Sequence, residues 1–207
     1  MTRPCFRIQG YIGEGRNTSA AVAGFLEIHA GEAVDIIVNS PGGDALEGSA
    51  ILAEIEAHGL VRCIVRGVAA SSASLLICGA SEIVMHRAAY LMLHSPWTMT
   101  VGDSEAHRKA ADLLEKVGRT DAEVYATTSG QPLARVEAWL AQELWLDASE
   151  SVALGFADAI EEAGQGETPA KHDYSAHEGA PSALMRLAQE NGWVAEPPKS
   201  KMETSNA

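Results

Sequence analysis

The sequence predicts an α/β protein in which short buried strands alternate with amphipathic helices. The chain has 207 residues, of which 46% are hydrophobic, enough to build a core of ordinary size. Apolar, β-branched runs such as residues 34–38 (VDIIV) predict buried strands, and apolar residues three and four apart predict helices between them. Strands that alternate with helices pair in parallel through right-handed crossovers, so a parallel sheet is expected.

The predicted elements follow one another along residues 1–162. The apolar, β-branched stretches predict strands at residues 6–12, 34–38, 61–66, 82–85 and 90–93. Helical spacing of apolar residues predicts helices at residues 18–29, 45–58, 71–78, 102–127 and 133–142. In such sheets, binding and catalytic groups lie beyond the carboxyl ends of the strands.

Residues 163–207 differ in composition from the rest of the chain. They contain four prolines and few aliphatic residues, a composition typical of a polar, mostly flexible tail. Leu184, Met185 and Leu187 predict one short helix at residues 182–191. We therefore expect one folded domain over residues 1–162 and a C-terminal tail over residues 163–207.

Charge and cysteine content exclude several classes of protein. With 15 basic and 28 acidic residues the net charge is −13, which argues against nucleic-acid or anionic membrane partners because phosphate affinity needs clustered Lys and Arg. The longest uncharged run, residues 67–81, is shorter than the ~20 residues that cross a bilayer. Cys5, Cys63 and Cys78 form no CxxC pair, so neither a disulfide framework nor a metal site is expected. A cytoplasmic protein without a cofactor fits best.

Two polar segments at strand ends carry serine and glycine. Residues 39–44 (NSPGGD) contain consecutive glycines, whose N–H groups can point at a bound group; the alternative is an ordinary turn with Asp44 as N-cap. In residues 67–74 (GVAASSAS), Ser71 would lie at a helix start, where the helix dipole favours negative charge. That position suits a nucleophile whose attack creates an oxyanion, although Ser71 or Ser72 could instead only cap the helix.

A third strand end carries a histidine. His94 follows the strand at residues 90–93 and precedes Ser95 and Pro96, so it is well placed as a general base; a structural histidine is the alternative. A glycine pair, a serine at a helix start and a histidine at a strand end are together the parts of a serine hydrolase. The sequence has no G-x-S-x-G elbow.

At these residues the sequence resembles the Clp protease proteolytic subunit (ClpP) family. The resemblance rests on four blocks in order, residues 39–43 (NSPGG), 67–71 (GVAAS), 92–96 (MLHSP) and 148–158 (ASESVALGFAD). Within that family the sequence is most similar to the phage Clp-like head maturation (prohead) proteases, through residues 8–13 (IQGYIG), 44–48 (DALEG), 108–114 (RKAADLL) and 143–147 (ELWLD). The resemblance implies a ClpP/crotonase-like spiral of ββα units, with residues 102–127 as a long handle helix.

The resemblance also implies a role for each matching residue. Ser71 matches the nucleophile and His94 the general base, while the N–H groups of Gly43 and Ser72 match the oxyanion hole. The third triad position, commonly an aspartate in the family, falls at Glu143.

Asp147 is a competing candidate for the third position. Its alternative role is to cap a helix that begins at Ala148, with Glu150 completing a capping box. We favour Glu143 for the catalytic role.

Peptide substrate is expected to bind as an added strand. The residues that would line it are Ala45, Leu46, Trp97, Thr98 and Met99.

The expected function is that of an ATP-independent serine endopeptidase, a homo-oligomeric ring that cleaves scaffold or capsid proteins in the host cytoplasm or an assembling virion. Only residues 1–5 precede the first predicted strand, too few for the axial loops with which the bacterial subunit docks its ATPase, and the sequence has no phosphate-binding motif. The alternatives are a bacterial ClpP-type subunit that works with an AAA+ unfoldase, and an inactive crotonase-like assembly module.

Overall fold

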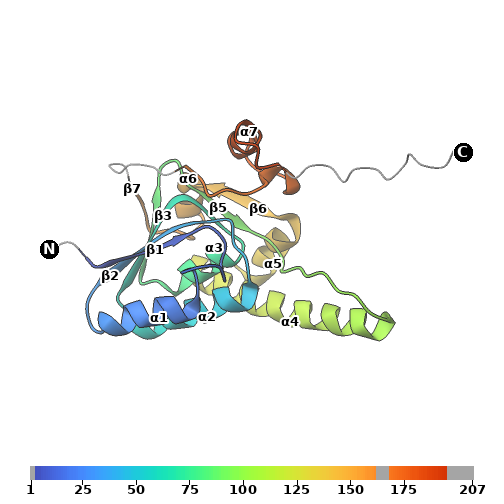
Figure 1. Cartoon of the computed structure of the whole chain (residues 1–207), viewed down its shortest axis with the longest axis horizontal. Coiled ribbons are helices and arrows are strands. Elements are labelled where there is room, and N and C mark those ends of the chain that lie inside the picture. The colour runs from blue at the N-terminus through green and yellow to red at the C-terminus, as the bar shows by residue number, and fades with distance from the viewer. Residues whose placement is uncertain (1–2, 162–167, 195–207) are drawn as a thin grey trace, which may run out of the picture. The chain divides into compact units, whose positions relative to one another are not determined.

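The computed structural model describes residues 3–161 and 168–194 (Figure 1). These residues fall into two compact units divided after Ala170, and each unit is described by itself. The first contains the sheet and most helices. The second contains a 3-10 helix, η2 (Tyr174–Ala176), and one α-helix, α7 (Ser182–Glu190), within the range predicted for a short helix.

The first unit is built on a seven-stranded sheet. Its main path runs in the order β1-β2-β3-β4-β7, and β5 pairs with both β3 and β6. The strands are β1 (Cys5–Gln9), β2 (Val34–Ser40), β3 (Val61–Ala70), β4 (Glu82–His86), β5 (Tyr90–Leu93), β6 (Leu144–Asp147) and β7 (Ala159–Glu161). β3 forks the sheet, because residues 62–65 pair with β4 and residues 68–70 pair with β5.

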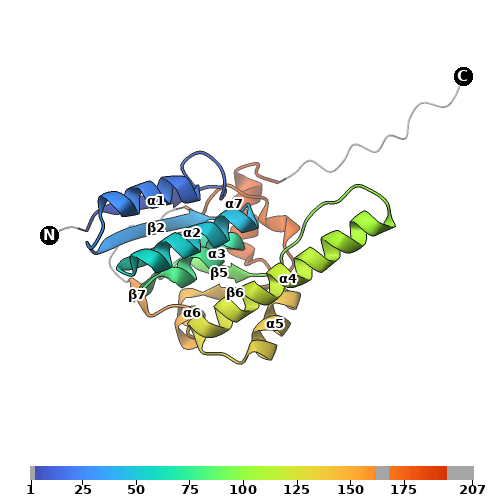
Figure 2. The same cartoon turned by 90° about the horizontal axis from the view of Figure 1, so that it is seen from below.

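The helices cover the sheet and extend beyond it. They are α1 (Ser19–Ile28), α2 (Ala45–His58), α3 (Ser72–Leu76), the 3-10 helix η1 (Ile77–Gly79), α4 (Ser104–Ser129), α5 (Leu133–Gln142) and α6 (Ala148–Ala153). Figure 2 shows α1 and α2 side by side along the sheet, and their residues are in contact. The long helix α4 begins at its outer tip and runs back to the body of the unit, where its buried residues Ala122 and Tyr125 lie, and it overlaps the handle helix predicted at residues 102–127.

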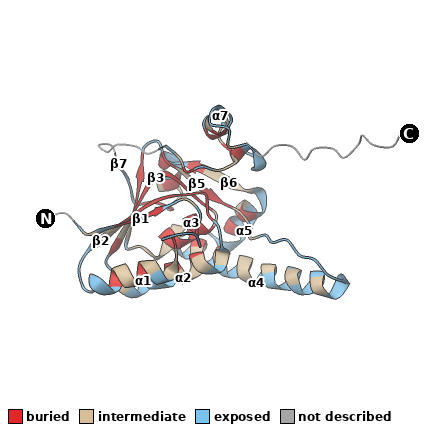
Figure 3. Ribbon diagram, viewed as in Figure 1, coloured by how far each residue is buried: buried red, intermediate tan, exposed pale blue. Residues whose placement is uncertain are grey.

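The core lies between the central strands and the helices packed on them. In Figure 3 the strands are mostly buried, whereas most of α4 is intermediate or exposed. β2 and β3 are covered along nearly their whole length, which explains their continuous apolar sequence. Helix α2 contributes Ile51, Leu52 and Ile55 to the same core. The α/β fold class with a long helix is therefore confirmed.

The structure corrects two predictions about the strands. β3 was predicted to end at Arg66, but it continues to Ala70. At Gly67 the backbone has φ +118°, and any Cβ would collide with the side chain of Asn39. The strand can continue past Asn39 because residue 67 has no side chain. The purely parallel sheet was also wrong, because β6 was not predicted and pairs antiparallel with β5. Within the described residues, no helix is long and apolar enough to span a bilayer.

Candidate active site

Ser71 lies at a strained turn between β3 and α3. Its backbone has φ 56° and ψ −129°, a conformation that residues other than glycine rarely adopt and that costs roughly 1–3 kcal/mol. Backbone hydrogen bonds fix it on both sides: the Ser71 N–H donates to Met92 O at 3.0 Å, and the Ser71 carbonyl accepts from Ser74 N at 2.9 Å and Leu75 N at 3.2 Å. The turn is therefore held by β5 as well as by α3.

The side chain of Ser71 meets that of His94. The Ser71 Oγ lies 2.7 Å from His94 Nε2, and it makes no capping hydrogen bond to α3. The two residues come together because β5, which leads into His94, pairs in parallel with the end of β3, which leads into Ser71. A hydrogen-bonded Ser–His pair is the nucleophile and base arrangement of serine hydrolases.

The turn that contains Gly42 and Gly43 packs against Ser71. A Cβ on Gly42, where φ is +98°, would lie 2.7 Å from both Ala70 O and Ser71 Cβ, and one on Gly43 would collide with the backbone of Ile12. Gly42 and Ser71 therefore touch only because no side chain separates them.

Helices α2 and α3 approach closely at the same place. Asp44 accepts a hydrogen bond from Glu47 N and caps α2, as predicted. One turn on, a Cβ at Gly48 would lie 2.7 Å from Ser72 Cβ. Ser72 is buried against this helix, and its Oγ makes no hydrogen bond within the described residues. The Ser72 side chain therefore packs, which leaves its backbone N–H as the group of interest.

The β5–β6 pairing separates the two acids considered for the third position. Leu93 pairs with Leu144 at one end of this ladder, so the next residues along the two strands are His94 and Glu143. Asp147 pairs with Tyr90 at the other end. Glu143 is half-buried with φ 56°, and its Oε1 accepts a hydrogen bond from the indole N–H of the nearby tryptophan, Trp145, at 3.0 Å.

Asp147 has the structural role that was predicted as its alternative. It is exposed and caps α6, accepting a hydrogen bond from Glu150 N at 2.8 Å, while Glu150 Oε2 accepts from Asp147 N at 2.9 Å. The Ser149 hydroxyl and the backbone N–H groups at this helix start lower the pKa of Asp147. The capping box is thus confirmed.

A small recess adjoins Ser71 and His94. Its other lining residues are Ala45, Ser72, Leu75, Pro96, Asp121 and Tyr125. Burial raises the pKa of the Asp121 carboxyl to about 6. Sequence reasoning missed Asp121 and Tyr125, although their spacing of one helical turn on the long helix could have placed them on one face.

The hydroxyls of Ser74 and Tyr125 lie against the backbone turn at Ser71. Ser74 Oγ lies 2.7 Å from Tyr125 OH and 2.7 Å from the carbonyl oxygens of Ser71 and Met92. The Tyr125 hydroxyl also lies 3.4 Å from Ser71 O. Helix α4 therefore reaches the strained turn through Tyr125.

The residues predicted to bind peptide divide into two groups. Ala45 lines the recess, whereas Leu46, Trp97 and Met99 are exposed at 68%, 71% and 87%. Thr98 is likewise exposed. Residues 94–103, which include Trp97, Thr98 and Met99, form neither helix nor strand.

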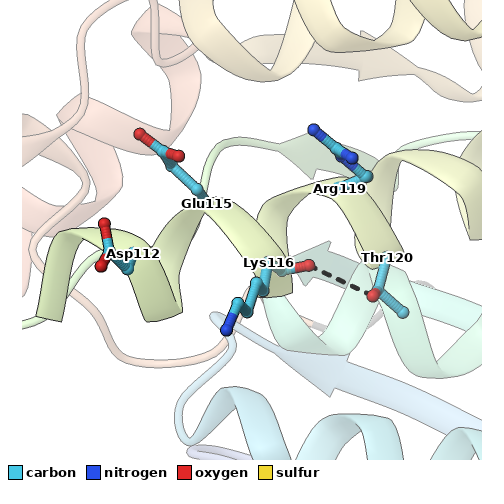
Figure 4. A pocket seen from close by; sticks show the side chains of 5 residues that line it. All are labelled: Asp112, Glu115, Lys116, Arg119 and Thr120. Atoms are coloured by element: carbon cyan, nitrogen blue, oxygen red, sulfur yellow. Dashed lines mark hydrogen bonds between the residues drawn. The ribbon is translucent and has the colours of Figure 1, made fainter. Parts of the chain in front are cut away.

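A larger hollow lies along α4, away from these groups. It is lined by Asp112, Glu115, Lys116, Arg119 and Thr120 (Figure 4). All five come from the helix itself, and the Thr120 hydroxyl donates to the backbone oxygen of Lys116 at 3.2 Å. No serine, cysteine or histidine is among the residues that line the hollow, and no cluster of potential metal ligands occurs among the described residues. The recess at Ser71 is therefore the candidate active site.

Comparison with known proteins identifies the family of the chain. The sequence model of the Clp protease family matches residues 17–164. The ATP-dependent Clp protease proteolytic subunit 1 of Chlamydia caviae is 30% identical over 148 residues, covering 66% of this chain and 74% of the relative. Subunit 2 of Bacillus licheniformis is 28% identical over 130 residues, covering 61% and 68%, and the subunit of Streptococcus agalactiae is 31% identical over 133 residues, covering 61% and 67%. With its matching fold, the chain belongs to the Clp protease family of serine proteases.

Proposed function

We propose that the chain is a serine endopeptidase in which Ser71 is the nucleophile, His94 the general base and Glu143 the third triad member. The observation that carries this proposal is the 2.7 Å contact between Ser71 Oγ and His94 Nε2, at a backbone turn whose strained φ of 56° is typical of functional sites.

The proposed reaction follows from the positions of these groups. His94 Nε2 takes the proton of Ser71 as its Oγ attacks the peptide carbonyl carbon, and the N–H groups of Gly43 and Ser72 donate to the oxyanion. The imidazolium then protonates the leaving amine, which departs and leaves an acyl-enzyme. Water, deprotonated by His94, attacks the ester and releases the acid. Glu143 orients and stabilises the imidazolium.

A fluorophosphonate probe tests the site directly. Labelling should be lost in Ser71→Ala and retained in Ser72→Ala, whose backbone N–H remains. Peptidase activity should fall by several orders of magnitude in Ser71→Ala and in His94→Ala, and the double variant should lose little more because the residues act as a unit. A wild-type protein that neither labels nor cleaves any peptide would favour the inactive assembly module.

We propose further that the protein acts without ATP on scaffold or capsid segments, as a phage head maturation protease. The resemblance of residues 8–13 and 143–147 to that branch supports this. The relatives, by contrast, are named ATP-dependent proteolytic subunits, which favours the second candidate, a subunit that works with an AAA+ unfoldase.

Degradation of a folded reporter distinguishes these two functions. With a host unfoldase and ATP present, the phage-type enzyme should cleave an unfolded casein-like substrate and leave the stable reporter intact. Degradation of the reporter that depends on ATP would support the second candidate instead.

We propose also that copies of the chain form a closed ring. On α4, only Ala122 and Tyr125 are buried, while the apolar side chain of Leu113 is 57% exposed, so a second copy could cover it. Light scattering at micromolar concentration should show a homo-oligomer. A monomer under these conditions would contradict the proposal.

A further inference from the structure

Asp121 brings a negative charge into the recess beside the catalytic pair. Its carboxylate lines the same recess as Ser71 and His94, and no described residue is found to give it a hydrogen bond or an ion pair. Burial alone raises its pKa to about 6. Above that pH, Asp121 is ionised in a partly dry site.

The titratable groups that face Asp121 do not offer a compensating charge in the resting enzyme. Cys78 of η1 and Tyr125 of α4 both interact electrostatically with it. Burial raises the pKa of the Cys78 thiol to about 12 and that of Tyr125 well above its usual range, so both are neutral near pH 8. His94, which follows β5, accepts the Ser71 proton only during turnover. A partly buried carboxylate without a cation is unfavourable, and a cationic ligand would relieve that cost.

The place of the recess indicates which ligand group would enter it. Because the recess adjoins Ser71 and His94, a side chain next to the scissile bond would enter it, and we assign it to the residue on the amino side. Ala45, Leu75 and Pro96 form apolar walls that suit a methylene chain.

The size of the recess distinguishes between basic side chains. Its free space of about 20 Å³ holds one water-sized group. An ammonium is a compact charge of that size, whereas a guanidinium is a broad, planar fork. The site therefore suits lysine better than arginine.

We propose that Asp121 is a specificity-determining residue that makes the enzyme prefer lysine on the amino side of the scissile bond. This inference rests on the proposed peptidase function. The lysine stem would lie along Leu75 and Pro96, and its ammonium would replace water next to the Asp121 carboxylate.

Three fluorogenic peptides that differ only at this position test the proposal. They carry lysine, norleucine, which has an uncharged straight side chain, or arginine. At pH 8 the wild type should cleave the lysine peptide with a kcat/KM roughly 10- to 100-fold higher than the norleucine peptide, as expected for a hydrogen bond between charged groups. Arginine should fall between them.

The matched variants assign the preference to one carboxylate. Asp121→Asn should bring the lysine-to-norleucine ratio of kcat/KM to about one, and the comparison uses this ratio rather than the rate with either peptide. Asp112→Asn, an exposed position on the same helix, should keep the wild-type ratio. The ratio should also fall towards one below pH 6, where Asp121 is protonated.

The outcomes separate this inference from the function on which it rests. A wild type that labels with fluorophosphonate but cleaves norleucine as well as lysine would overturn the inference alone. So would an Asp121→Asn variant that keeps the lysine preference. A wild type that neither labels nor cleaves any of the peptides would overturn both the inference and the proposed function.

Discussion

Replacing Ser74 by alanine should loosen the turn that holds the nucleophile. Ser74 Oγ has one proton and three partners at 2.7 Å: the Tyr125 hydroxyl and the carbonyl oxygens of Ser71 and Met92. Tyr125 is 3% exposed, and burial holds its pKa well above the usual range, so it is neutral and donates. Ser74 therefore accepts from Tyr125 and donates to one carbonyl.

The expected cost follows from the groups left without partners. In Ser74→Ala the buried phenol keeps only its 3.4 Å contact to Ser71 O, and an unsatisfied buried group costs about 1–3 kcal/mol of unfolding free energy. Tyr125→Phe removes the donating hydroxyl itself, so no phenol is left without a partner. This variant should therefore cost only about 0.5–1.5 kcal/mol of unfolding free energy. Because both variants break the same bond, the double variant should cost less than the sum, by about 1 kcal/mol.

Urea denaturation measures these costs, and the rate of fluorophosphonate labelling reports the geometry of Ser71. Both single variants should label more slowly, because the strained turn loses part of its support. As a control, Ser49→Ala removes a hydroxyl that bonds only within its own helix, to Ala45 O, and should change stability by less than about 0.5 kcal/mol. Costs of Ser74→Ala and Tyr125→Phe that simply add would refute the idea that the two hydroxyls act as one unit.

Four further substitutions have distinct expected results. Glu143→Gln should keep the fold but lower kcat. Asp147→Ala should keep kcat and lower the unfolding free energy by ~1 kcal/mol, because the helix loses its cap. The opposite result in kinetic assays would reassign the third triad position to Asp147. Gly42→Ala should abolish labelling of Ser71, because its Cβ would lie 2.7 Å from Ser71 Cβ, and an alanine variant that labels normally would show that the turn can move. Asp121→Asn should raise the unfolding free energy at pH 8 by roughly 1–2 kcal/mol, discounted for partial exposure, and leave it unchanged near pH 3. The sign follows because the pKa of Asp121 rises from 3.8 to about 6 on folding, so stability falls as pH rises through that interval; equal shifts at both pH values in denaturation experiments would contradict it.

The sequence predicted those parts of the site that depend on local pattern. Ser71 and His94 each follow an apolar strand, and parallel strands carry their ends to one edge of a sheet, so the order of strands and polar residues along the chain already indicates that the two side chains lie close together. The N-cap at Asp44 and the capping box at Asp147 were equally predictable, since both depend on residues within one helical turn.

Features that depend on tertiary packing were not predictable in this way. The four residues of β6 have no marked strand pattern and are ordered by pairing with β5. β3 continues through residue 67 past the side chain of Asn39, which leaves room only for a glycine. Local propensity does not indicate this contact between distant residues. Asp121 lies on a long, polar helix, and which side of that helix turns towards Ser71 is set by packing across the domain.

The pairing of β5 with β6 has a consequence for the order of events during synthesis. β5 leads into His94, yet its antiparallel partner leaves the ribosome only after the whole of α4 and α5. Contacts between segments so distant in sequence form late, because a long loop must first be closed. A nascent chain that already contains Ser71 and His94 therefore lacks β6, the strand that follows Glu143. With Glu143 in its proposed role, the triad is complete only after most of the domain has been translated.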